Sequence, residues 1–252
     1  WGLVAFSLTA SGIYVINDIR DREKDRCSTT KCHRPIAAGK ISVPHAIIYA
    51  VFLLALALLC GYMASGLSPA GLGLLGAYFL MNLGYSLGLK NVPLVDIAIL
   101  ALGFLLRMLY GSAVTSIEPS KWLCLTVISV SFYMGLGKRR GELLSQKGAT
   151  RAVLKYYNQS FLDKNMYMCI ALAVVFYSLW TVDDLTVLRV GSENLIWTVP
   201  LVILICLAAP LAAYRRMTGK RSVVDRLREL HDRVLLLLGA LLAVLIFSVI
   251  YL

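Results

Sequence analysis

The sequence predicts an all-α polytopic membrane protein. Hydrophobic residues make up 59% of the 252 residues and charged residues only 15%, and the mean hydropathy is +0.74. Apolar runs long enough to cross a bilayer recur along the whole chain, and helices satisfy the backbone hydrogen bonds of such runs in lipid. The charged residues gather between the runs. This pattern excludes a soluble globular domain.

Eight apolar runs predict eight transmembrane helices. They cover residues 1–16, 46–63, 67–89, 93–114, 122–137, 165–182, 195–214 and 234–252. Most are separated by short turns that contain Gly, Pro or Ser. Three connections are long and polar, namely 20–40, 138–164 and 215–233. No soluble domain fits between the runs, so we expect a single transmembrane helical domain over residues 1–252.

The basic residues predict the orientation of these helices. Of the 25 Lys and Arg residues, 22 lie in the three long connections or at Lys90, which share one side if every run crosses the membrane. By the positive-inside rule this side is cytoplasmic. The net charge of +11 then reflects topology and lipid contact, and we expect no nucleic-acid binding. The same parity places Trp1 outside, so we expect one further helix before it and nine in total.

An acidic stretch, residues 17–25, stands where the first apolar run meets water. If the helix continues through it, Asp18, Asp21 and Asp25 fall within about 60° around the axis, with Asn17 one turn below Asp21. Carboxylates that close repel one another, so the spacing favours a divalent cation, and all-oxygen ligands suit Mg²⁺. The alternative is a solvated helix end in which these acids pair with nearby bases, namely Arg20, Arg22, Lys24 and Arg26.

Two other stretches carry bases suited to phosphate. Lys31 and Arg34 lie further along the first polar connection, and an Arg side chain can contact phosphate through two hydrogen bonds. At the end of the fifth run, Lys138, Arg139 and Glu142 lie within about one turn of one another if the helix persists. The alternative for this second group is an ordinary set of membrane-flanking bases.

These stretches resemble the motifs of a known family. Residues 17–25 resemble the N-D-x-x-D-x-x-x-D motif of the UbiA-type intramembrane prenyltransferase superfamily, and residues 31–39 are similar to its K-x-x-R-P-I-A-A-G stretch. Further elements are similar to the decaprenyl-phosphate phosphoribosyltransferase branch, among them Tyr85-Ser86, Leu89-Lys90, Asp96, Leu106-Arg107, Ser120-Lys121-Trp122, Tyr157 and Asp163. The second Asp-rich motif of the aromatic prenyltransferases is absent, and residues 137–142 stand in its place.

The resemblance implies a UbiA-like bundle in the plasma membrane with an active site that faces the cytoplasm. It implies Mg²⁺-dependent transfer of 5-phosphoribose from 5-phosphoribosyl 1-diphosphate to a polyprenyl phosphate, with release of diphosphate, for the synthesis of cell-envelope polysaccharide precursors. Asp18, Asp21 and Asp25 would be catalytic and, with Asn17, would hold the metal. The substrate-binding residues would be Lys31, Arg34, Lys138, Arg139, Glu142 and Tyr157.

Two other functions stay open. One is a polyprenyl-diphosphate prenyltransferase that acts on an aromatic or other acceptor, and the other is a non-catalytic membrane transporter or scaffold. The charges cluster on one side, and no apolar run carries a chain of ionisable residues across the bilayer, which disfavours an ion path. The sequence leaves open the roles of Asp96, Arg107 and Lys121 and the formation of a homo-oligomer.

Overall fold

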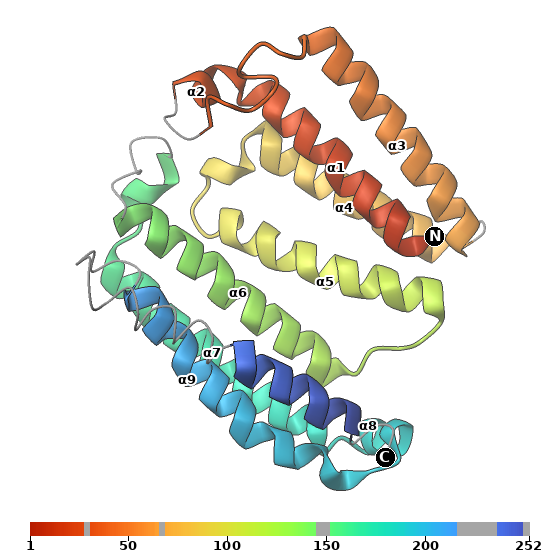
Figure 1. Cartoon of the computed structure of the whole chain (residues 1–252), viewed down its shortest axis with the longest axis vertical. Coiled ribbons are helices and arrows are strands. Elements are labelled where there is room, and N and C mark those ends of the chain that lie inside the picture. The colour runs from red at the N-terminus through yellow and green to blue at the C-terminus, as the bar shows by residue number, and fades with distance from the viewer. Residues whose placement is uncertain (28–30, 66–68, 145–151, 216–235, 249–252) are drawn as a thin grey trace. The chain divides into compact units, whose positions relative to one another are not determined.

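The computed structural model describes residues 1–27, 31–65, 69–144, 152–215 and 236–248, and all regular structure in these ranges is helical (Figure 1). This confirms the predicted all-α class. The chain forms two compact units. The first combines Trp1–Pro119 with Gly148–Tyr157, and the second combines Ser120–Lys147 with Asn158–Leu252.

The first unit is built from long helices and short connecting turns. The long helices are α1 (Gly2–Arg20), α3 (Val43–Ser65), α4 (Pro69–Leu87) and α5 (Val95–Thr115). The short ones are α2 (Arg22–Arg26), η1 (Leu89–Asn91) and η3 (Ala152–Tyr156). Helix α1 packs mainly against α3, and α4 packs mainly against α5.

Small side chains allow α1 and α3 to approach closely. A Cβ atom built on Gly12 of α1 would lie 3.0 Å from the Leu54 side chain of α3. Ala50 and Ala57, also on α3, are buried. Because lipid tails are as apolar as leucine, helices associate in a membrane through close packing of this kind.

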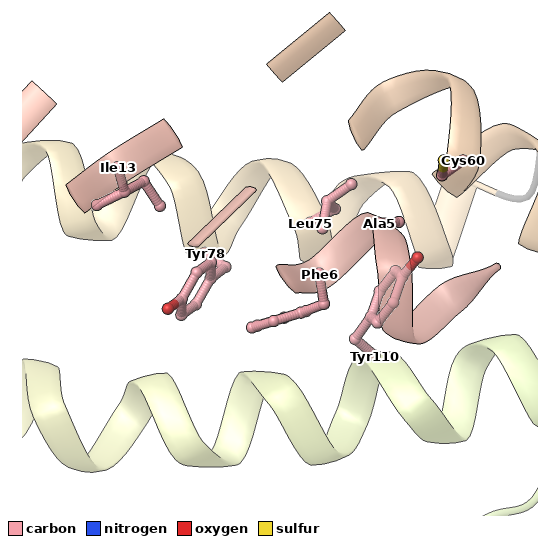
Figure 2. Packing of buried hydrophobic residues seen from close by; sticks show 7 residues of the cluster. All are labelled: Ala5, Phe6, Ile13, Cys60, Leu75, Tyr78 and Tyr110. Carbon is pink, nitrogen blue, oxygen red and sulfur yellow. The ribbon is translucent and has the colours of Figure 1, made fainter. Parts of the chain in front are cut away.

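An aromatic cluster ties α1 to α4 and α5. The Phe6 ring lies between Tyr78 and Tyr110 (Figure 2), with centroid distances of 4.3 and 5.5 Å. Such aromatic pairs contribute about 0.5–1.5 kcal/mol each beyond the area they bury. The cluster therefore fixes the helix whose far end carries Asn17 and Asp18. Its other buried members are Ala5, Ile13, Cys60 and Leu75.

The second unit contains the remaining helices. These are α6 (Lys121–Leu144), α7 (Gln159–Thr181), α8 (Asp184–Val190), η4 (Glu193–Thr198), α9 (Val199–Arg215) and a helix over Leu236–Ser248. Helix α7 begins at Gln159, earlier than its apolar run, because Asn158 caps it: the Asn158 side chain accepts a hydrogen bond of 2.7 Å from the Phe161 N–H. The sequence did not predict α8.

Five helices of the described ranges are long and apolar enough to cross a membrane, namely α1, α3, α4, α5 and α7. A sixth span arises if α8 and Glu193–Ala208, which are bent by 104°, are taken together. Part of the expected run 234–252 lies outside the described residues. The chain is an integral membrane protein, whereas eight spans, the further helix before them and the single domain stay predictions.

Candidate active site

Helix α1 extends into the acidic stretch. It ends at Arg20, so Asn17 and Asp18 are helical, and Asp21 separates it from α2. The Asp21 N–H donates to the Asn17 carbonyl at 2.9 Å, and the Asp25 N–H donates to the Asp21 carbonyl at 2.8 Å. The hydrogen bonds between residues four apart therefore continue across the break. The single helix assumed from the sequence is nevertheless interrupted at Asp21, and the shared face of the three aspartates stays a prediction.

Arg34 joins two of the acids. Its Nη1 donates to Asp18 Oδ1 at 2.6 Å and to Asp25 Oδ2 at 3.0 Å. Lys31 Nζ lies 4.0 Å from Asp25 Oδ1. Asp25 is only 3% exposed, so these two bases are the described partners of a buried side chain.

The local fold of the first connection presents Arg34 to these acids. The Ala38 N–H donates to the Arg34 carbonyl at 2.7 Å, and Gly39 closes the turn with a φ of 74° that favours glycine. Arg26 Nε donates to the Ala37 carbonyl at 3.0 Å, which ties the turn to α2. Ile36 and Ala37 are buried. Backbone and side-chain contacts together therefore hold the turn that carries Arg34.

The third acid pairs with a residue from η1. Lys90 Nζ donates to both carboxylate oxygens of Asp21, at 2.6 and 2.8 Å. Beside it, Ser86 Oγ of α4 donates to Asn17 Oδ1 at 3.3 Å. The sequence marks Lys90 as a topological charge and as part of an element, Leu89-Lys90, that is similar to the phosphoribosyltransferase branch. It does not predict the contact with Asp21, because a partner 69 residues away cannot be inferred from local spacing.

Glu23 lies outside this network. It pairs with Arg22 at 2.6 Å and with Arg26 at 3.4 Å, and it is exposed. The hydrogen bond from Arg22 lowers the pKa of the Glu23 carboxyl below its ordinary value. The solvated helix end considered as an alternative thus fits Glu23. The described contacts of the three aspartates lead instead to Lys31, Arg34 and Lys90.

The donor chemistry of this network suits magnesium. Arg34 Nη1 lies between the Asp18 and Asp25 carboxylates, so a cation already bridges them. Carboxylate and amide oxygens are the ligands that Mg²⁺ prefers. Within the described ranges no three acidic, His or Cys side chains converge on one point, and the described ion pair of Asp21 is with Lys90. The oxygen atoms of these side chains are therefore suitable ligands for Mg²⁺. In this structure the Arg34 guanidinium lies between the carboxylates of Asp18 and Asp25.

The second predicted group lies on α6, in the second unit. The helix persists to Leu144, as that prediction required. Arg139 is fully buried and its Nη1 donates to Glu142 Oε2 at 2.8 Å, whereas Lys138 is exposed. Arg140 pairs with Asp163 of α7. Neighbouring bases thus have different surroundings, and of the predicted pair Lys138 is the one that solvent reaches.

The Tyr157 hydroxyl makes an internal contact. It donates to Asp96 Oδ1 at 2.7 Å and accepts from the Leu94 N–H at 2.7 Å. Asp96 is fully buried and Tyr157 is 6% exposed. Leu94 has a φ of 65°, which is uncommon for a non-glycine residue. Tyr157 therefore holds residues 152–157 to the start of α5, and its expected contact with substrate stays a prediction.

Fold and site together define an all-helical integral membrane protein in which bases from neighbouring elements neutralise an acidic helix end. The chain belongs to the UbiA prenyltransferase family, whose model matches residues 1–231. It is 39% identical over 184 residues to the decaprenyl-phosphate phosphoribosyltransferase of Corynebacterium glutamicum. It is 40% identical over 182 residues to the enzyme of that name from Mycolicibacterium smegmatis.

These matches cover 71% and 70% of this chain but 55% and 56% of the two relatives, so the chain matches little more than half of their length. A solved UbiA homologue from Archaeoglobus fulgidus, bound to GPP and Mg²⁺, has the same fold, with a TM-score of 0.70. That comparison covers 100% of this chain and 87% of the other at 19% identity.

Proposed function

We propose that this protein transfers 5-phosphoribose from 5-phosphoribosyl 1-diphosphate to a polyprenyl phosphate. The observation that carries the proposal is the balanced network of three aspartates and three bases, namely Asp18, Asp21 and Asp25 with Lys31, Arg34 and Lys90. A metal-bound diphosphate needs acidic ligands for the metal and bases for the phosphate oxygens, and this network supplies both. The names of the curated relatives support the choice of donor and acceptor.

The metal would be held by Asp18, Asp21 and Asp25, with Asn17 assisting. When bound, Mg²⁺ supplies positive charge to the leaving diphosphate. Lys31 and Arg34 would bind phosphate oxygens once they leave the carboxylates that they now contact. Lys138 and Arg139 would bind phosphate as well, Glu142 would orient Lys138 or a ribose hydroxyl, and Tyr157 would contact the donor.

The reaction breaks the bond between ribose C1 and the diphosphate oxygen and forms a bond from C1 to a phosphate oxygen of the lipid. Diphosphate leaves with the electron pair of the broken bond. The acceptor oxygen is already anionic, so it needs positioning and charge cancellation more than a general base. Direct attack on C1 predicts inversion of configuration there.

The bases also support an orientation. A soluble, highly anionic donor is attracted to the membrane face that carries 22 of the 25 basic residues, which we propose is cytoplasmic. The lipid acceptor would enter from the bilayer. The product would feed the synthesis of cell-envelope polysaccharide precursors.

The test uses membranes that contain the full chain, with Mg²⁺, radiolabelled 5-phosphoribosyl 1-diphosphate and a polyprenyl phosphate. We expect label to enter an acid-labile lipid whose intact mass equals that of the acceptor plus one phosphoribosyl group. If no label enters lipid and the protein instead joins a prenyl diphosphate to an aromatic acceptor, the proposal is wrong. Activity in neither assay would favour a transporter or scaffold.

Prenyl transfer from a prenyl diphosphate is the second candidate. It is supported by the GPP-bound homologue and by 32% identity over 146 residues to the digeranylgeranylglyceryl phosphate synthase of Sulfolobus acidocaldarius. Against it, the sequence has bases at 138–140 where the aromatic prenyltransferases carry a second acidic motif.

A further inference from the structure

A cavity of about 710 Å³ lies within the first unit, between the first half of α1 and the second half of α5. Its lining includes Leu3 and Phe6 from α1 and Arg107, Gly111 and Val114 from α5. Phe6 and Asp18 are twelve residues apart on one helix, which corresponds to about 18 Å along its axis. The cavity is thus distinct from the acidic network.

Arg107 gives this cavity a positive charge. In the described part of the chain no carboxylate forms an ion pair with it. Its guanidinium lies 5.0 Å from the centroid of the Phe6 ring and 5.7 Å from that of Phe104. Asp96, on the same helix, is eleven residues away, or about 17 Å. The two aromatic rings offset only part of the free-energy cost of placing the Arg107 cation inside a membrane-spanning helix. The cavity therefore favours the binding of an anion beside Arg107.

The remaining walls favour an anion that carries an apolar chain. Apolar side chains such as Leu3, Phe6 and Val114 make up most of this lining, and its three hydroxyls, those of Ser7, Tyr110 and Thr115, are too few to replace all the water around a free phosphate ion. Around Gly111 the cavity is open, because a Cβ atom built there meets nothing within 4 Å. Arg107 lies eight residues, or about 12 Å, from the Thr115 end of α5, within reach of the head groups of that leaflet.

We propose that this cavity binds an anionic phospholipid of the leaflet at the Thr115 end of α5, with the lipid phosphate on Arg107 and an acyl chain against Phe6 and Val114. The proposal does not depend on the proposed enzyme function. A polyprenyl phosphate acceptor would place its phosphate near Asp18, at the other end of α1.

The test measures retention of radiolabelled phosphatidylglycerol and phosphatidylcholine by the purified full chain during gel filtration. We expect the wild type to retain phosphatidylglycerol at least five-fold better. Arg107→Gln should abolish this preference, and Arg107→Lys, which keeps the charge, should preserve most of it. Gly111→Leu should reduce retention of phosphatidylglycerol by filling the cavity. Gly76→Leu is its matched control, since Gly76 on α4 is equally open but does not line the cavity.

An unchanged preference in Arg107→Gln would overturn the proposal, as would an equal loss in Gly111→Leu and Gly76→Leu. If Arg107→Gln does not fold, the comparison of phosphatidylglycerol retention between Gly111→Leu and Gly76→Leu tests the proposal. Displacement of phosphatidylglycerol by an equimolar short-chain polyprenyl phosphate would also overturn it, because the cavity would then belong to the acceptor.

Discussion

At the scale of single residues, each aspartate of the acidic stretch has a different set of partners. Asp18 accepts from Arg34, Asp21 accepts from Lys90, and buried Asp25 accepts from Arg34 with Lys31 nearby. Each carboxylate thus has at least one base beside it in a partly buried setting. Their contributions to function should therefore be separable by substitution.

Asp21→Asn should lower transfer activity by about 10²-fold or more, because it weakens the charge that holds the metal on the leaving diphosphate. The measurement is the initial rate of label transfer in Mg²⁺. Glu23→Gln is the matched control, since this exposed acid of the same stretch pairs only with Arg22 and Arg26 among its described contacts. Turnover near the wild-type rate in Asp21→Asn would rule out the metal role.

Lys90→Ala should impair the same step, since it removes two charged hydrogen bonds to Asp21. A hydrogen bond to a charged group contributes about 1.5–3 kcal/mol, so kcat/KM for the phosphoribosyl donor should fall by roughly 10-fold or more. Lys40→Ala, at an exposed position of the first connection, should leave kcat/KM unchanged. Equal effects of the two substitutions would contradict a specific role for Lys90.

Lys138→Ala and Arg139→Ala should differ in their effects. Both bases are proposed to bind phosphate, but Arg139 is fully buried against Glu142 and Lys138 is exposed. Removing one partner of a buried charge pair costs about 3–5 kcal/mol, so Arg139→Ala should lower the Tm strongly. Lys138→Ala should weaken donor use with little change in Tm. Thermal unfolding and donor KM measured on both variants test this, and a similar Tm for the two would contradict it.

At the scale of elements, short segments between the long helices complete the site. The η1 turn carries Lys90, the turn after α2 carries Arg34, and residues 152–157 are held to α5 through Tyr157. Val153 and Leu154 of that last segment are buried as well. The segment follows α6 in the sequence but belongs to the first unit.

Tyr157→Phe tests this attachment. It removes the hydrogen bond that the phenol donates to buried Asp96 and the one that it accepts from the Leu94 N–H, and each such hydrogen bond contributes about 0.5–1.5 kcal/mol. We expect a lower Tm measured by thermal unfolding in detergent. Tyr156→Phe is the control, because the neighbouring Tyr156 is 72% exposed. Equal Tm values for the two variants would show that the hydroxyl contacts do not stabilise the segment.

At the scale of the whole molecule, apolar helices place the acids and most bases at helix ends and connections. Membrane insertion requires this separation, because charge inside the bilayer is costly. The proposed reaction uses the same separation, since an anionic donor and a divalent metal must meet charged side chains in water while the acceptor stays in lipid.

Removal of divalent metal should abolish transfer in the intact protein. Chelation with EDTA should reduce label incorporation to background, and Mg²⁺ added in excess should restore it. Ca²⁺ should restore it poorly, because Ca²⁺ prefers longer bonds and a higher coordination number. Full activity in EDTA would mean that the bases alone neutralise the diphosphate.

The sequence alone determined the features that depend on neighbouring residues. Apolar runs predict helices because each helix satisfies its own backbone. The shared face of Asp18, Asp21 and Asp25 stays a prediction, because the 100° repeat behind it assumed a continuous helix and α1 ends at Arg20. Helix α6 continues beyond residue 137, as the predicted proximity of Lys138, Arg139 and Glu142 required. Its continuation depends on the same kind of hydrogen bonds within the helix.

Only the tertiary structure decided which charges meet. Lys90 reaches Asp21 across 69 residues, Tyr157 reaches Asp96 across 61, and Arg34 reaches Asp18 across 16. Such pairs depend on how the helices pack and on where each turn ends. Hydropathy predicts neither, because a helix face that contacts lipid is as apolar as one that contacts another helix. The full burial of Arg139 beside exposed Lys138 has the same origin, since the side chains of adjacent residues on a helix point about 100° apart.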